Sequence, residues 1–216
     1  MSLDRQLQEA VLAEFFWDPS ITAAHIGVAA DDGVITLTGH VPSYLEKSAT
    51  ERAARRVRGV KAVAQEIEVV LPVQTERSDE DIAHAALERI AWDVAIPADA
   101  ITLKVEQGWI SLNGEVSWYF QKDAAQSVIQ GLRGVTGISN LITIKPHPEV
   151  TDIAGAIGTA LHRAWFDRAK IRVSATGGVI TLDGTVHTPA EKRKATMTAW
   201  AAPGATEVVN NLVVTG

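Results

Sequence analysis

The sequence of 216 residues contains no cysteine. This absence excludes disulfides, thiolate metal sites and a cysteine nucleophile, and it is typical of a reducing compartment. Long apolar runs are also missing, because no stretch approaches the roughly 18 residues that a membrane-spanning helix needs. Basic residues are outnumbered, 20 against 26 acidic ones, which gives a net charge of −6. A chain with this charge is a poor match for nucleic acid, so we expect no nucleic-acid partner.

The patterns of common catalytic and metal sites are absent too. The six histidines form no His-x3-His or HExxH pattern, and neither a phosphate-binding glycine loop nor a GxSxG elbow occurs. We therefore expect a non-enzymatic protein with no catalytic, cofactor-binding or metal-binding residues. The N-terminus has acidic residues where a signal peptide has basic ones. This pattern predicts a cytoplasmic location, or a periplasmic one if a signal peptide has been removed.

Glycines divide the chain into three copies of one unit. Alternating strands over 34–41, 109–116 and 179–186 each contain one glycine, and a second glycine follows each of these by 20 positions. Internal repetition at a fixed period is a strong sign of repeated structural units. The six glycines in matching register are Gly39, Gly59, Gly114, Gly134, Gly184 and Gly204.

Hydrophobic periodicity predicts the same order of elements in each unit, namely helix, strand, strand, helix, strand. The last strand-helix-strand step must be a right-handed parallel crossover. The expected fold class is α+β, with three tandem α-β-β-α-β units, each a three-stranded mixed sheet with two helices on one face. The expected domains are 1–73, 76–146 and 148–216, and the second helices are expected near 43–58, 118–133 and 188–202.

The glycine inside each central strand has two interpretations. Asn113-Gly114 and Asp183-Gly184 are typical of hairpin turns. The apolar alternation nevertheless continues past the glycine to Val116 and Val186. We therefore favour a glycine inside a strand, at a bulge or where another part of the chain approaches the backbone closely. Gly59 and Gly134 are expected to end the second helices, because glycine readily adopts the left-handed conformation found there.

These features resemble the BON domain. The resemblance is carried by Asp18-Pro19, by DGVITLTGHV over 32–41, by Lys47 and by Val57-x-Gly59-Val60. The second copy keeps Trp92-Asp93 and Lys122, and the third departs most. The arrangement is similar to bacterial, osmotic-stress-inducible and transport-associated tandem BON proteins. The resemblance implies a non-enzymatic protein that binds phospholipid or attaches to a membrane surface, and some cytoplasmic relatives are linked to potassium.

The second helix of the first unit is the candidate surface for anionic lipid. It carries Arg52, Arg55 and Arg56, and Arg52 and Arg56 share one face because they are four residues apart. Next to anionic lipid each such charge contributes around 1 kcal/mol. The alternative is an ordinary solvated helix face that contains a Glu51–Arg55 pair.

Three consecutive aromatic residues begin the second helix of the middle unit. Phe120 aligns with the apolar Leu45 and is expected in the core. Tyr119 aligns with Tyr44 and is expected to be half-buried. Trp118 occupies an N-cap position, where tryptophan lacks a capping oxygen and costs about 1 kcal/mol relative to serine or threonine. We therefore expect Trp118, with Tyr119, to belong to a contact surface with a neighbouring unit or with lipid.

Three classes of partner remain open from the sequence. Phospholipid or a membrane surface is the leading one. The first alternative is a cation, such as potassium, or a small ligand held by acidic loops such as Asp31-Asp32. The second is a scaffold that binds another protein or another copy of this chain.

The predicted domain boundaries can be tested by limited proteolysis. Two proline-containing linkers separate the units, and exposed linkers are preferred sites of cleavage. Mass spectrometry of the fragments is expected to locate cleavage near residues 73 and 147. Stable fragments that end inside 34–41, 109–116 or 179–186 would contradict the division into three units.

Overall fold

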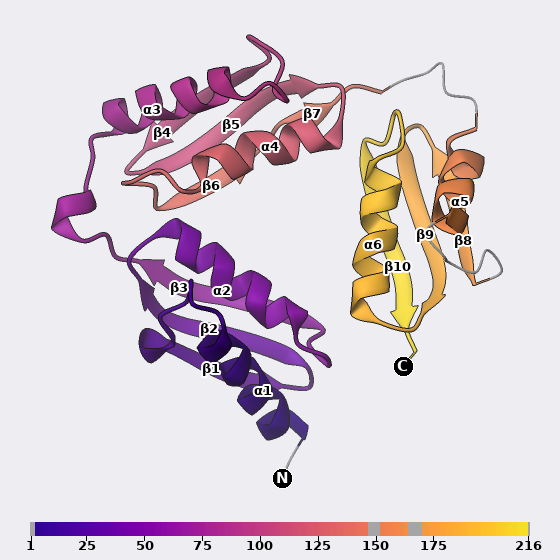
Figure 1. Ribbon diagram of the computed structural model, residues 1–216, viewed down its shortest axis with the longest axis horizontal. Helices are drawn as coiled ribbons and strands as arrows, with labels where there is room; N and C mark the ends of the chain where they lie inside the picture. Colours follow the sequence, from indigo (N-terminus) through magenta and orange to yellow (C-terminus); the bar gives the residue numbers. More distant parts are fainter. Residues whose placement is uncertain (1–2, 147–151, 164–169, 216) are drawn as a thin grey trace. The chain divides into compact units, whose positions relative to one another are not determined.

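A computed structural model describes residues 3–146, 152–163 and 170–215 (Figure 1). The predicted α-β-β-α-β order is confirmed three times along the chain. Each repeat contains its own mixed sheet, with two helices on one face of it. The fold class expected from the sequence is therefore correct.

The first repeat shows the topology most completely. Its elements are α1 (Leu3–Trp17), β1 (Ile26–Asp31), β2 (Val34–Val41), α2 (Tyr44–Arg56) and β3 (Ala62–Val69). The central strand β2 pairs antiparallel with β1 and parallel with β3. Short 3-10 turns at Ala23–His25 and Val73–Thr75 precede β1 and the second repeat. Figure 1 shows α1 and α2 side by side, and the core forms between them and the sheet.

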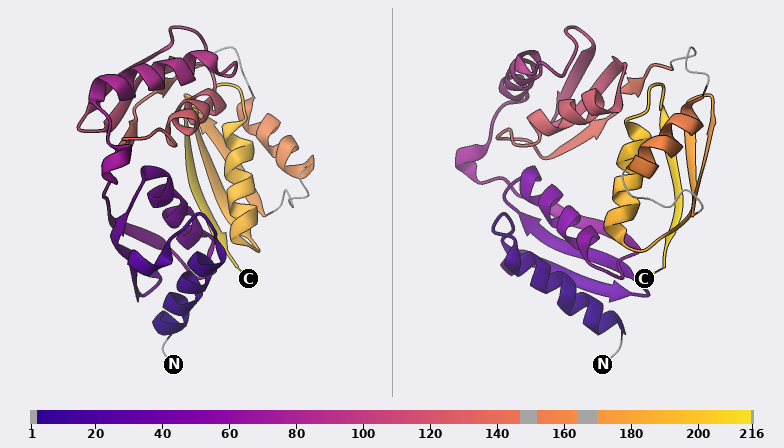
Figure 2. Two further views of the ribbon diagram at one scale, coloured as in Figure 1. Left: turned by 60° about the vertical axis from the view of Figure 1, so that its left-hand side comes forward. Right: turned by 45° about the vertical axis from the view of Figure 1, so that its right-hand side comes forward.

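The other two repeats follow the same plan. The second contains α3 (Asp79–Trp92), β4 (Ile101–Glu106), β5 (Trp109–Val116), α4 (Tyr119–Ile129), β6 (Gly137–Asn140) and β7 (Thr143–Ile144). Its third strand is interrupted, so that β6 and β7 both pair with β5. The third contains α5 (Ile153–Arg163), β8 (Ile171–Thr176), β9 (Val179–Val186), α6 (Pro189–Trp200) and β10 (Glu207–Val214). Figure 2 shows these elements from two further directions.

The first two strands of every repeat form a tight hairpin with a two-residue loop. Both loop residues have positive φ, for example 51° at Asp32 and 86° at Gly33. Two consecutive residues of this kind make a type I′ turn, whose twist matches that of the paired strands. In repeats one and two the first helix also holds the turn. Asp4 and Asp79 of these helices accept hydrogen bonds from the backbone N–H groups of the turn.

The glycine inside each central strand lies against the backbone of the segment that enters the first strand. Gly39, Gly114 and Gly184 have φ of 111°, 142° and 131°. A Cβ atom at Gly114 would fall on the carbonyl oxygen of Ala100, and the same collision occurs at the other two glycines. The chain therefore needs glycine there both for its conformation and for space.

The second helix is tied to the third strand by one amide group in every repeat. In each case the side-chain NH2 group of a glutamine or asparagine on the strand donates to a lysine carbonyl of the helix. The pairs are Gln65 with Lys47, Asn140 with Lys122, and Asn210 with Lys192. This bond fixes how the helix lies along the sheet.

The second helices end earlier than the sequence indicated. α2 ends at Arg56 and α4 at Ile129. Gly59 and Gly134 lie in the turns beyond these ends, with φ of 96° and 87°. The expectation that they directly terminate the helices is wrong, although both positions still require the left-handed conformation that favours glycine.

Replacing Gly114 by alanine is expected to destabilise the protein by about 1–3 kcal/mol, because the new Cβ meets the Ala100 carbonyl and the backbone becomes strained. Gly131→Ala is the matched control, since no atom lies within 4 Å of a Cβ built there. Chemical denaturation of both variants measures the difference in the free energy of unfolding. Equal stability of the two variants would show that the contact at Gly114 is not restrictive.

Candidate functional site

Two of the three arginines predicted to face lipid are paired with acids of their own repeat. The Arg55 guanidinium lies 2.8 Å from the Glu51 carboxylate. Arg56 lies 2.9 Å from Glu14 and 3.1 Å from Asp18, both on or beside α1. Their charges are therefore largely neutralised. This agrees with the alternative interpretation, in which α2 is an ordinary solvated helix face with a Glu51–Arg55 pair.

Arg52 differs from its two neighbours on α2. Its guanidinium donates a hydrogen bond of 2.7 Å to the Ser48 hydroxyl, and it has no acidic partner in the part of the chain that the structure describes. One exposed and unneutralised guanidinium makes only a small contribution to binding an anionic surface. The structure therefore offers weaker electrostatic support for lipid binding at α2 than the sequence suggested.

The burial of the aromatic residues at the start of α4 differs in part from the expectation. Phe120 is 56% exposed, so its predicted place in the core is wrong. The aligned Leu45 is 43% exposed, which means that this position faces solvent in both repeats. Tyr119 is half-buried as expected, and burial raises the pKa of its phenol.

Trp118 is also half-buried, and the cap of α4 is made by another residue. The Gln121 side chain accepts hydrogen bonds of 3.0 Å from the N–H groups of Ser117 and Trp118. At the corresponding positions Ser43 and Thr188 cap their helices with their own hydroxyls. The amide of Gln121 therefore supplies the N3 half of a capping box. Ser43 and Thr188 supply the other half in their repeats, by accepting from the N3 N–H group, whereas the Gln121 N–H donates to the Trp118 carbonyl oxygen.

Trp118 and Tyr119 line a hollow of about 310 Å³ together with residues of α6. The rings of Tyr119 and Trp200 stack there with their centroids 4.2 Å apart. Phe120 and Met197 also line it. The assignment of Trp118 and Tyr119 to a contact surface stays a prediction.

The most exposed aromatic side chains lie elsewhere, at the ends of the first helices. Phe16 and Trp17 end α1 and are 87% and 86% exposed, and Trp92 ends α3 and is also 86% exposed. Val94 lies two residues after Trp92 and is fully exposed. We call Phe16 with Trp17, and Trp92 with Val94, the apolar tips of repeats one and two.

The two tips are held by the same turn. Asp18 and Asp93 follow the helices, and their carboxylates accept hydrogen bonds from the N–H groups of Ser20 and Ala95. Three residues after each aspartate a buried isoleucine anchors the chain, namely Ile21 and Ile96. The backbone that follows each tip is therefore held by a hydrogen-bonded turn and by a buried isoleucine.

The exposed residues on the second helices lie at the same end of each repeat as the tips. In repeat one the link is direct, because the Thr22 N–H donates a 2.6 Å hydrogen bond to the Glu46 carboxylate. Leu45 precedes Glu46 and Phe120 has the matching place in repeat two. Figure 1 shows the end of α3 and the start of α4 at the same end of that repeat.

One repeated pair of residues in the sequence marks these tips, although the apolar periodicity of the helices favours a core position for the tryptophans. Trp-Asp occurs at 17–18 and at 92–93, at matching places of the repeats. A tryptophan at the end of an apolar helix is normally assigned to the core, and Phe15, two residues before Trp17, is indeed fully buried. Helical rotation of about 100° per residue separates the two rings, and only the folded structure shows which one faces the core.

The acidic hairpin loop, named above as the candidate for a cation, is held by a hydrogen bond from a basic side chain. Asp32 lies in the type I′ turn, and its carbonyl oxygen accepts a 2.8 Å hydrogen bond from the Lys61 ammonium group. Among the described residues, no group of three or more acidic or histidine side chains is arranged to hold a metal ion. In the same residues, no helix is long and apolar enough to cross a membrane.

Comparison with known proteins gives one family over almost the whole chain. The family described as "BON domain" matches residues 3–70, 78–146 and 149–216. Osmotically-inducible protein Y of Escherichia coli (strain K12) is 24% identical over 146 residues, which are 66% of this chain and 73% of that protein.

The similarity to solved structures is weak. CdsD, a structural protein of the type III secretion system of Chlamydia trachomatis, has a TM-score of 0.28 at 17% identity, over 97% of this chain and 92% of that one. The periplasmic domain of PrgH has a TM-score of 0.23 at 9% identity, over 88% and 95% of the two chains. Such TM-scores support no inference about function.

The ion-pair cluster beneath the first tip predicts a pH dependence of stability. Hydrogen bonds from Ser20 and then Arg56 lower the pKa of Asp18 below its ordinary value. A carboxylate with a lowered pKa stabilises the folded state above its unfolded pKa of about 3.9, and this contribution is lost as the pH falls through the folded pKa. The stability difference between wild type and Asp18→Asn is therefore expected to be full at neutral pH and to shrink below about pH 4.

Urea denaturation across this pH range measures the effect. Arg56→Met is the companion variant, because it removes one of the donors that lower the Asp18 pKa while it keeps the carboxyl group. Because the folded-state pKa of Asp18 rises in this variant, the loss of stability on acidification is expected to occur at higher pH than in the wild type. Parallel pH profiles for all three proteins would exclude a role for this cluster.

Proposed function

Because this chain belongs to the BON family through three BON domains, we propose that it is a non-catalytic protein that associates with phospholipid surfaces. The proposed contacts are the apolar tips of repeats one and two. Its relation to an osmotically inducible protein suggests a place in the response to osmotic stress.

The observation that carries the proposal is the exposure of matching aromatic residues. Trp17 and Trp92 end equivalent helices, and both are 86% exposed. These large apolar side chains project at the same place in two repeats. Packing within a repeat does not explain them. Exposed apolar groups of this kind mark contact sites with proteins or membranes.

A membrane interface suits these residues chemically. An indole ring is apolar but has one N–H donor, and tryptophan is therefore enriched at the level of the lipid headgroups. Burial of one large apolar side chain contributes about 1.5–3 kcal/mol. Insertion of two tips would supply a membrane affinity similar to that of other shallow apolar anchors.

The charge distribution favours apolar insertion over electrostatic attraction. The net charge is −6, and Arg55 and Arg56 are already paired with carboxylates. Arg55 and Arg56 would therefore add little attraction to an anionic membrane. We expect binding to zwitterionic as well as anionic phospholipid, with weak dependence on salt.

Vesicle flotation tests the proposal. Wild-type protein is expected to float with phosphatidylcholine vesicles, and the affinity of Trp17→Ser or Trp92→Ser is expected to fall on the order of tenfold. Leu3→Ser is the matched control, because Leu3 is 83% exposed on α1 but lies at the opposite end of that helix. Neither tryptophan is packed in a core, so thermal unfolding of the variants should change little.

Salt separates the two binding mechanisms. Raising the ionic strength from about 0.1 M to about 1 M shortens the screening length from about 10 Å to about 3 Å. Binding through the tips should persist at the higher salt. The opposite result is binding that needs anionic lipid, disappears at high salt and keeps its full affinity in both tryptophan variants. It would reject the tips as the contact and would assign lipid binding to Arg52, Arg55 and Arg56.

A further inference from the structure

A groove of about 490 Å³ lies between α5 and α6 in the third repeat. Alanines of α5 and of the turn that follows α6 form much of its lining, among them Ala160, Ala201 and Ala202. Arg163 and Lys194 also line it, one from each helix. Its volume falls within the range of about 300–1,000 Å³ that is usual for small-molecule sites.

Two residues that pack or join the helices in repeat one are replaced in repeat three. The two second helices can be aligned by Glu46 and Glu191, whose N–H groups bond to the capping hydroxyls of their helices. Ala49, three residues after Glu46, is buried in the core that also contains Val11 and Phe15 of α1, whereas the matching residue in α6 is the exposed Lys194. The matched residue on α6 thus faces solvent along the groove instead of packing against the first helix.

The salt bridge that seals the same position in repeat one is also missing. Arg56 spans from α2 to Glu14 and Asp18 at the end of α1. Its counterpart, ten residues after Glu191, is Ala201. A methyl group therefore stands where repeat one has a long side chain that joins the two helices.

The two basic residues lie at one end of the groove. Ala156, Ala160 and Arg163 occupy successive turns of α5 on one side. The helix pair is antiparallel, as in repeat one, where Leu7 near the start of α1 lies beside Gly59 beyond the end of α2. Arg163 near the end of α5 is therefore close to Lys194 in the first half of α6, and both line the groove. The alanines continue away from this pair.

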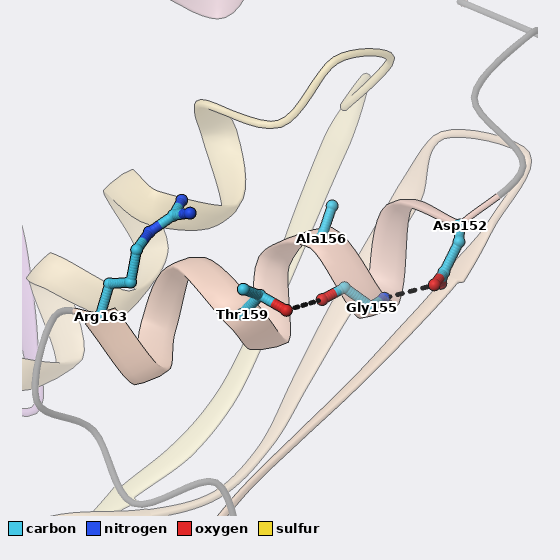
Figure 3. A pocket seen from close by; sticks show the side chains of 5 residues that line it. All are labelled: Asp152, Gly155, Ala156, Thr159 and Arg163. Atoms are coloured by element: carbon cyan, nitrogen blue, oxygen red, sulfur yellow. Dashed lines mark hydrogen bonds between the residues drawn. The ribbon is translucent and has the colours of Figure 1, made fainter.

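Figure 3 shows how Arg163 is directed. Its side chain leaves the end of α5 and extends towards the ribbon of α6. Two other polar side chains drawn there form hydrogen bonds within α5 or at its start. The Asp152 carboxylate accepts from the Gly155 N–H group, and the Thr159 hydroxyl donates to the Gly155 carbonyl. Neither Arg163 nor Lys194 has an acidic partner within residues 3–146, 152–163 and 170–215.

We propose that this groove binds a monomeric anionic amphiphile, such as a fatty carboxylate or an alkyl phosphate. The headgroup lies between Arg163 and Lys194, and the alkyl chain follows the alanine-lined part. A charged pair beside an apolar channel matches both ends of such a ligand, and the charge-assisted hydrogen bonds orient it. The groove shares no residue with the apolar tips, so this site is independent of the proposed membrane contact.

Isothermal titration calorimetry with soluble decyl compounds tests the site. Decanoate and decyl phosphate are expected to bind, each below the concentration at which it forms micelles. Decanol and inorganic phosphate are expected to bind at least about tenfold more weakly, because each lacks one half of the ligand. Decanol that binds as well as decanoate would overturn the role of the basic pair, and phosphate that binds as well as decyl phosphate would overturn the role of the channel.

Two variants locate the binding. Arg163→Glu combined with Lys194→Glu reverses two exposed charges and is expected to abolish decanoate binding, while Arg172→Glu, an exposed arginine on β8, is the charge control. Ala160→Phe fills the groove and is expected to block both decyl ligands without a change in charge. Unchanged decanoate affinity in the double charge reversal would place the ligand elsewhere.

The failure of this proposal is distinguishable from failure of the membrane contact. Trp17→Ser and Trp92→Ser are expected to retain decanoate binding, and the double charge reversal is expected to retain flotation with phosphatidylcholine vesicles. Loss of decanoate binding in the tip variants would assign both activities to one apolar surface and would overturn the separate groove.

Discussion

The close contact between two backbone segments at the central-strand glycine governs each repeat. The carbonyl oxygen of the residue before the first strand lies where a side chain of Gly39, Gly114 or Gly184 would otherwise be. In repeats two and three this oxygen also accepts a hydrogen bond from the residue after the glycine. The contact fixes where the chain that comes from the first helix joins the sheet.

The three repeats share this framework but use their helix surfaces differently. In repeat one Arg56 joins the two helices through its ion pairs with Glu14 and Asp18. In repeat three Ala201 has the same place and leaves a groove with a basic end. Repetition of one fold therefore does not imply repetition of one binding site, because a few side chains between the helices decide whether an opening exists.

The difference between the predicted and observed charge surface has a simple physical cause. The pair of Arg55 with Glu51 was visible in the sequence, since residues four apart on a helix are neighbours. The pairing of Arg56 with Glu14 and Asp18 joins residues 42 and 38 positions apart. Such contacts depend on how α1 lies against α2, which no local pattern specifies. A basic helix can therefore look available in the sequence and be neutralised in the fold.

The sequence by itself determined the three repeats, their order of elements and the family, because glycine spacing and hydrophobic periodicity act locally and recur in register. It also indicated that glycine was required inside each central strand. Only the tertiary structure decided that Phe120 is exposed, that Trp17 faces outward beside the buried Phe15, and that a groove opens between α5 and α6. These outcomes depend on which side of a helix meets its neighbour, and burial of a side chain is a property of both surfaces rather than of one stretch of sequence.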